Sequence, residues 1–297
     1  MGKNNKSPSR DWKEMDYEVL LRIFMTLNMV DFVAVSWVCS SWRKVCQDQV
    51  FWNGKVLDLS KLPLQLTQSS PRMIQFLMYV LYLSGGKLGY LIFDFRLPLT
   101  DGIFINIARR SVNLRRLLLP GRHLQLTDAG IKEAMQNWEG LESFTITDSE
   151  IACSIIEAIG RYCRRSFREL KITCHFSLKI ALKLIKYVPK LKRLSLQSTR
   201  VNKDALVFAV AQLGELEDLN VSHSFIVGGD RPENITVFSQ HQVPDILVGE
   251  VLRMPRIISC GLFCNMCEDV LFWNMANEWE NPEEQIWRED EILTLRV

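Results

Sequence analysis

The amino-acid sequence predicts an α/β fold in three parts: a three-helix bundle near the N-terminus, a curved solenoid with a parallel sheet and outer helices, and a helical cap. An apolar pattern that recurs through the middle of the 297 residues predicts the solenoid. An apolar-rich stretch that breaks this pattern predicts the bundle. The expected boundaries are a disordered tail over 1–10, the bundle over 11–56, the repeats over 57–225, a loop over 226–241, and the cap with an acidic tail over 242–297.

The repeated pattern reads Leu-x-x-Leu-x-Leu, with other apolar residues allowed at each position. Successive matches are separated by 26, 27, 26, 24 and 25 residues, a regularity that single matches could not supply. The alternation within each match is that of a short strand with one buried face. The six matches begin at Leu88, Leu114, Leu141, Phe167, Leu191 and Leu216.

The segments between the matches have helical periodicity. Thr127 can cap a helix that carries Ile131, Ala134, Met135 and Trp138 on one face. A unit of one strand and one helix cannot bury its own apolar face, so that neighbouring units must stack. The expected result is a solenoid with its strands on the concave side.

Residues that alternate with the core positions of the strands should face the concave side. This row is partly charged and partly apolar, and two interpretations stay open: a surface that binds a protein substrate, or a solvated sheet face. The candidate substrate-binding residues are Arg116, Leu118, Glu169, Lys171, Arg193 and Asp218.

Residues 12–52 predict three helices, over 18–27, 29–38 and 40–47. Apolar residues occupy most of the circumference of the first helix, where a surface helix would show a single stripe. About forty residues cannot enclose this much apolar surface, which indicates burial against another protein. The alternative is packing on the adjoining solenoid, which we expect at least for Phe51 and Trp52.

The same stretch resembles the F-box of plant F-box proteins with leucine-rich repeats. Residues 12–27 are similar to its opening, and Val-Cys-x-x-Trp-Arg at residues 38–43 is similar to its closing helix. The chain has Met15-Asp16 where the family has Leu-Pro. We expect Asp16 to cap the first helix in place of that pair and Met15 to fill an apolar pocket.

The resemblance implies a substrate receptor of an SCF-type ubiquitin ligase, with the F-box at residues 11–56. The F-box would bind a Skp-type adaptor, itself attached to a cullin scaffold, and the repeats would hold an unknown protein substrate. The alternative is a repeat scaffold that is not engaged in a ligase. By motif position, the expected adaptor contacts are Met15, Leu20, Ile23, Leu27, Val38 and Trp42, with contact and internal packing both open for Trp42.

Enzyme and metal hypotheses have little support in the sequence. Cys260, Cys264 and Cys267 have the spacing of three thiolates around an iron–sulfur cluster, but only 30 residues follow them. A zinc ion would need a fourth ligand, for which His241 is the nearby candidate. The cysteine spacing also fits one buried helix face. We therefore expect no catalytic residue, metal or cofactor.

Composition restricts the partners and the compartment. The net charge of +2, from 36 basic and 34 acidic residues, gives no footprint for nucleic acid, and no apolar run reaches the length of a membrane helix. The polar first ten residues are not typical of a signal peptide. Eight cysteines then favour free thiols in a reducing compartment, so that we expect a cytoplasmic or nuclear protein.

Overall fold

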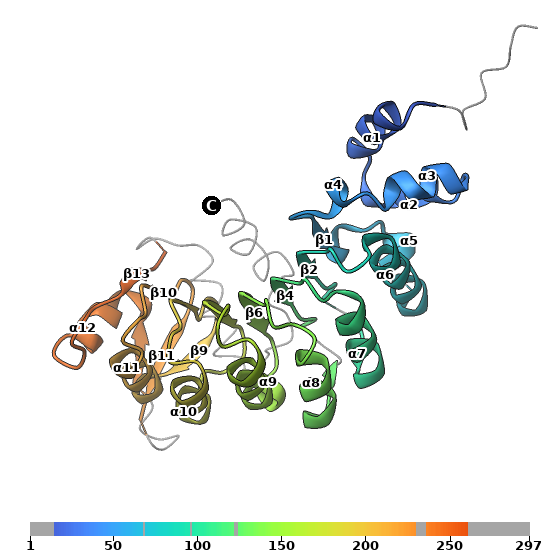
Figure 1. Ribbon diagram of the computed structural model, residues 1–297. Helices are drawn as coiled ribbons and strands as arrows, with labels where there is room; N and C mark the ends of the chain where they lie inside the picture. The colour runs from blue at the N-terminus through green and yellow to red at the C-terminus, as the bar shows by residue number, and fades with distance from the viewer. Residues whose placement is uncertain (1–14, 68, 96, 122–123, 230–235, 261–297) are drawn as a thin grey trace, which may run out of the picture.

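The computed structural model describes residues 15–67, 69–95, 97–121, 124–229 and 236–260. A bundle of short helices lies at the N-terminal end of an arc of strand–helix units (Figure 1). The bundle consists of α1 (Tyr17–Met25), α2 (Met29–Ser36), α3 (Ser40–Cys46) and α4 (Gln49–Trp52). The sequence predicts the first three helices but not α4.

Eight strands of the described chain form one parallel sheet along the concave side of the arc. The α/β fold with a repeated parallel sheet is thus confirmed, and all six matches to the apolar pattern coincide with strands. In spatial order the strands are β1 (Val56–Asp58), β2 (Tyr90–Ile92), β4 (Arg116–Leu118), β6 (Ser143–Ile146), β7 (Glu169–Ile172), β8 (Arg193–Ser195), β10 (Asp218–Asn220) and β13 (Arg256–Ile258).

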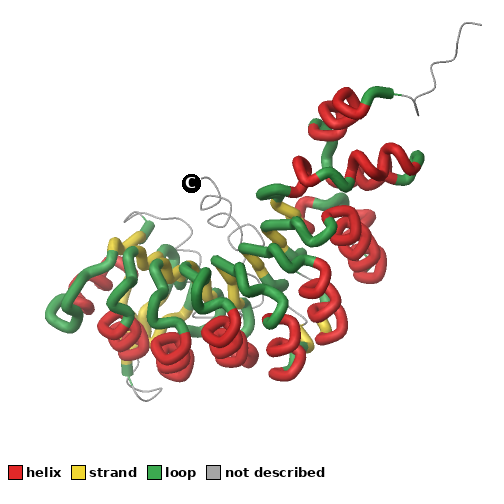
Figure 2. Tube along the Cα trace, in the orientation of Figure 1, coloured by secondary structure: helices red, strands yellow, loops and turns green. Residues whose placement is uncertain are grey.

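Helices line the convex side of the arc, with the strands inside it (Figure 2). After β1 come a short 3-10 turn (Leu59–Lys61) and α5 (Leu64–Thr67). The outer helices that follow are α6 (Ser70–Ser84), α7 (Asp101–Arg110), α8 (Asp128–Met135), α9 (Ser149–Tyr162), α10 (Leu178–Tyr187) and α11 (Lys203–Gln212).

The middle residue of each strand points into the core between the sheet and the helices. Leu91, Leu117, Phe144, Leu170 and Leu194 lie in register on neighbouring strands, and none is more than 2% exposed. The apolar pattern thus produces a continuous stack in which every repeat covers the next.

Side chains also hydrogen-bond backbone carbonyls of the preceding repeat. The Thr199 hydroxyl donates to the carbonyl of Ile172 at 2.9 Å. Between the outer helices, Trp138 Nε1 donates to the carbonyl of Ser111 at 3.0 Å, and the buried Cys163 thiol donates to the carbonyl of Trp138 at 3.2 Å. These bonds link each repeat to the preceding one through its backbone.

The C-terminal part of the sheet differs from expectation. Where the sequence suggests a loop over 226–241, β11 (Phe225–Gly228) pairs antiparallel with β12 (Thr236–Ser239) and parallel with β9 (Arg200–Asn202). A 3-10 turn (Gln240–Gln242), α12 (Val243–Leu247) and β13 follow, so that the parallel sheet extends beyond residue 225. A second small pair is β3 (Leu99–Thr100) with β5 (Leu124–Gln125). The part of the expected cap after residue 260, with its acidic tail, lies outside the described residues.

We predict that Thr199→Val lowers the free energy of unfolding by about 1–3 kcal/mol, because it leaves the buried Ile172 carbonyl without its donor while keeping the side-chain volume. Urea unfolding followed by circular dichroism would measure this. Thr199→Ser keeps the hydroxyl and should be closer to the wild type. A valine variant as stable as the wild type would contradict the role of this bond.

Candidate functional site

Side chains cap helices of the N-terminal bundle at their N-terminal ends. Asp16 accepts hydrogen bonds from the backbone N–H groups of Glu18 at 2.9 Å and Val19 at 3.4 Å, so that the expected cap of α1 is present. Asp48 caps α4 and accepts a hydrogen bond from the Tyr17 hydroxyl. This bond to a carboxylate raises the pKa of Tyr17 to about 12 and lowers that of Asp48.

Aromatic rings fill the interior of the bundle. The ring of Phe32 packs against those of Phe51 and Trp52, with centroids 5.0 and 5.6 Å apart. Trp52 is fully buried, and its Nε1 donates to the carbonyl of Cys46 at 2.9 Å. Phe51 and Trp52 are therefore buried at least partly within the bundle itself.

The predicted adaptor contacts divide into three groups. Ile23 and Val38 are 44% and 59% exposed, and their side chains are available to a partner. Met15, Leu27 and Trp42 are half-buried. Leu20 is only 3% exposed and belongs to the core of the bundle, so that its position favours a structural role over direct contact.

Trp42 packs within the bundle and stays partly accessible, so that its contact with an adaptor stays a prediction. Its ring meets that of Phe24 edge to face at 5.2 Å, while part of its surface stays accessible. The contacts expected from motif position leave out two other exposed apolar residues of α1, Val19 and Met25, at 46% and 55% exposure, which belong to the apolar excess of that helix. The uneven exposure of Val19 and Leu20 is set by the packing of α1 on α3, which apolar periodicity around most of the helix does not reveal.

The bundle is joined to the solenoid by an aromatic contact. Trp37, after α2, stacks on Tyr79 of α6 with ring centroids 4.7 Å apart and planes inclined by 19°. The hydroxyls of Ser36 and Tyr79 are 2.9 Å apart, and Arg43 Nε donates to the carbonyl of Ser36. Stacking and hydrogen bonds together fix the orientation of the bundle on the first outer helix.

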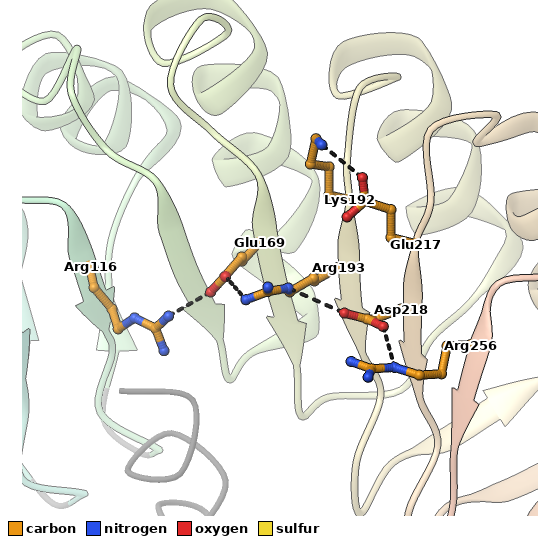
Figure 3. A network of polar contacts seen from close by, with 7 residues as sticks. All are labelled: Arg116, Glu169, Lys192, Arg193, Glu217, Asp218 and Arg256. Carbon is orange, nitrogen blue, oxygen red and sulfur yellow. Dashed lines mark hydrogen bonds and ion pairs between the residues drawn. The ribbon is translucent and has the colours of Figure 1, made fainter. Parts of the chain in front are cut away.

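Charged side chains form a row across the start of the concave strands, which we call the ion-pair row (Figure 3). The Glu169 carboxylate forms ion pairs with the guanidinium groups of Arg116, at 2.5 Å, and Arg193, at 2.7 Å. The Asp218 carboxylate forms ion pairs with the guanidinium groups of Arg193, at 3.3 Å, and Arg256, at 2.7 Å. Signs alternate along the row, so that each carboxylate lies between two guanidinium groups.

The structure thus brings four of the six predicted concave residues into one network. The fifth member, Arg256, was missed because it lies on β13, beyond the expected end of the repeats. These charges are already partnered, so that a ligand at the row would meet a mostly neutralised surface. A groove of about 540 Å³ borders the row, and its charged lining residues are Arg115, Arg116, Glu142, Arg168, Glu169, Lys192, Arg193 and Glu217.

The other two predicted residues, Leu118 and Lys171, belong to a second concave row. In register it runs Ile92, Leu118, Thr145, Lys171, Ser195. Leu118 is fully buried beside Ile92, and Lys171 is 5% exposed. A solvated sheet face does not describe this row.

Only one of the three candidate metal-binding cysteines lies in the described part of the chain. Cys260 is half-buried, whereas Cys264 and Cys267 lie outside the described residues. No cluster of three histidine, cysteine or acidic side chains placed to hold a metal ion occurs in the described part of the chain. No described helix combines the length and hydropathy needed to cross a membrane.

Comparison with known proteins agrees with this architecture. An F-box-like family model matches residues 17–57. The chain is 30% identical over 305 residues to F-box/LRR-repeat protein At3g48880 of Arabidopsis thaliana, with 97% of each chain covered. It is 27% identical over 223 residues to F-box protein SKIP19 of the same plant, over 74% of this chain and 71% of that protein.

We predict that Glu169→Gln lowers the free energy of unfolding by about 1–3 kcal/mol, because it removes the negative charge between Arg116 and the half-exposed Arg193. Arg116 has only 10% of its side chain exposed and would lose its ion pair.

The matched control is Glu217→Gln, which breaks the exposed pair with Lys192 and should cost much less. Urea unfolding of both variants decides the prediction. Equal destabilisation by the two changes would argue against a special role for the ion-pair row.

Proposed function

Because this chain belongs to the F-box/LRR-repeat protein family, we propose that it is the substrate-recognition subunit of an SCF-type ubiquitin ligase. Its F-box binds a Skp-type adaptor that is attached to a cullin scaffold, and its repeats bind a protein substrate. The chain contributes no catalytic group in this proposal. It works in the cytoplasm, the nucleus or both.

The observation that carries the proposal is the exposed apolar surface of the F-box. Val19, Ile23, Met25 and Val38 are each at least 44% exposed although each is a large apolar residue. Val19 and Ile23 are one helical turn apart on α1 and present the same face. Apolar side chains exposed in such number mark a protein-binding surface.

The junction between F-box and repeats supports a bridging role. The stack of Trp37 on Tyr79 holds the adaptor surface and the concave sheet in one orientation. Ubiquitin transfer then needs only that a substrate lysine is kept near a thioester on another subunit. A fixed orientation raises the effective concentration of that lysine.

The departure from the family at Met15-Asp16 does not undo the F-box. The Asp16 side chain caps the N-terminus of α1 by accepting two hydrogen bonds from backbone N–H groups, and Met15 packs at the edge of the core. The helix that would dock on the adaptor is therefore formed. This favours the ligase subunit over a scaffold whose F-box has lost its function.

We predict that Ile23→Asp with Val38→Asp weakens binding to a Skp-type adaptor by at least about 100-fold, because buried apolar anchors dominate such interfaces. Co-purification of the full chain with the adaptor, followed by calorimetry, would measure the loss. Leu20→Asp is unsuitable because Leu20 is buried and its change would unfold the bundle.

The control is Leu182→Asp on α10, an apolar residue of similar exposure (51%) far from the bundle along the chain. It should leave adaptor binding unchanged. If the double variant keeps its helical circular dichroism and still binds the adaptor at wild-type strength, the ligase assignment fails.

A further inference from the structure

Basic residues are concentrated in a short part of the solenoid. Residues 161–193 carry eleven of the 36 lysines and arginines of the chain and one of its 34 acidic residues. The rest of the chain is left with 25 basic and 33 acidic residues, so that it is net acidic. The positive charge of this segment, which runs from the end of α9 to the start of β8, is therefore a local feature of two repeats.

Several of these charges lie on the edge of the repeats where the outer helices end and the strands begin. Arg164 and Arg165 follow α9, Arg168 directly precedes β7, and Lys190 lies between α10 and β8. Because α9 packs on α10 and β7 pairs with β8, the two turns that join them lie side by side. We call these four residues the basic edge.

The basic edge has no carboxylate partner among the described residues. Arg164, Arg165 and Lys190 are exposed, and the Arg168 guanidinium donates only to the backbone carbonyls of Phe167 and Arg165, at 2.7 and 2.8 Å. The charges beside it are neutralised by contrast.

Lys192, whose backbone N–H donates to the carbonyl of Arg168, forms an ion pair with Glu217 at 2.7 Å (Figure 3). The basic edge thus keeps an unbalanced positive charge that its neighbours do not have.

Attraction to helix C-termini explains only part of the basic segment. Arg161 and Lys186 lie in the last turns of α9 and α10, where the helix dipole favours a cation. This effect falls off within the last turn, whereas Arg168 and Lys190 lie beyond it, in the turns that lead into the strands. Unpaired like charges in adjacent turns repel one another, and an anionic ligand removes that repulsion.

Carboxylates on both sides of the basic edge restrict the size of that ligand. In the line of residues that precede the strands, Glu142 lies on one side of Arg168, and Glu217 lies beyond Lys192 on the other. A nucleic-acid duplex carries a continuous line of phosphates and would meet these carboxylates. A short run of acidic side chains in a peptide fits between them, and arginine forks pair well with carboxylates.

The basic edge is continuous with the concave face. Arg168 and Lys192 line the groove of about 540 Å³ that borders the ion-pair row, together with Glu169 and Arg193 of that row. A peptide segment bound at the edge therefore reaches the concave strands directly. This is the surface to which the proposed function assigns the substrate.

We propose that the basic edge binds a short acidic segment of a protein substrate, with the carboxylates of that segment paired to Arg164, Arg165, Arg168 and Lys190. The residues that adjoin the acidic run lie in the groove. That the partner is a ubiquitination substrate rests on the proposed function; the affinity of the edge for an acidic peptide does not.

Fluorescence anisotropy of the purified full chain tests the site. The probe is a short labelled peptide with a run of glutamates between glycine–serine arms, and the same peptide with glutamines should not bind measurably. Arg164→Gln, Arg165→Gln and Lys190→Gln combined should weaken binding of the glutamate peptide by about tenfold, since three exposed ion pairs, each of modest strength, are lost together. Arg168 is left unchanged because its bonds to two carbonyls give it a structural role.

The control removes the same number of positive charges elsewhere. Arg72→Gln, Arg110→Gln and Lys132→Gln combined change exposed residues of α6, α7 and α8 and should leave peptide binding within about twofold of the wild type, because charges that lie far from the ligand are largely screened by salt. Equal weakening by the two triple variants would reduce the effect to net charge and overturn the proposal. Failure of the wild type to bind the glutamate peptide would overturn it as well.

Zero-length carbodiimide cross-linking locates the bound peptide. We expect amides between its glutamates and the exposed Lys190 or Lys186, found by mass spectrometry. Cross-links confined to lysines outside residues 161–193, such as Lys132, would contradict the assignment.

Two further outcomes separate this site from other interpretations. Binding of a short DNA duplex as tight as that of the glutamate peptide at the same salt concentration would overturn the proposal in favour of nucleic acid. None of these measurements involves the adaptor. A chain that binds the glutamate peptide at the basic edge but no Skp-type adaptor would keep the acidic-peptide site and remove the ligase assignment.

Discussion

The stacking of apolar side chains in register from strand to strand is the interaction on which the rest of the molecule depends. Leu117 lies between Leu91 and Phe144, and each strand of three or four residues is too short to be stable alone. Because every strand must align its middle residue with the next, the flanking positions are aligned as well. The concave rows are a consequence of this register. Arg116, Glu169, Arg193 and Asp218 meet because the buried leucines beside them do, and the charges then alternate at the distances that ion pairing needs.

The same apolar stack also connects the F-box with the concave sheet. The F-box is attached to the first outer helix through Trp37 and Tyr79, and α6 is itself held by the apolar stack. A partner bound to α1 and a ligand on the concave sheet are therefore connected through packed side chains and not through a flexible linker. In the proposed receptor, the orientation of the F-box on the solenoid would determine where a bound protein is presented.

Much of this fold follows from the sequence because the repeat is periodic. The constant spacing of the apolar pattern located β2, β4, β6, β7, β8 and β10, and the apolar residues of positions 12–52 located the first three helices. What could not be predicted depends on tertiary contacts. Exposure of Val19 and burial of Leu20 are decided by the packing of α1 on α3, since apolar residues surround most of that helix. Arg256 joins the ion-pair row through β13, which follows a hairpin and a short helix and has no apolar repeat of its own. Burial of Lys171 has no signature in a strand whose alternation is regular.

The buried thiol of Cys163 can report on local opening of the solenoid. It lies fully buried between neighbouring repeats, donates to the carbonyl of Trp138, and has its pKa raised to about 12 by burial. Only the thiolate reacts with alkylating reagents, so that in the closed solenoid this cysteine is inert at neutral pH. It becomes reactive when the repeats around α8 and α9 separate. The rate at which an alkylating reagent modifies Cys163 therefore measures local opening at the centre of the solenoid, and no label has to be introduced into the protein.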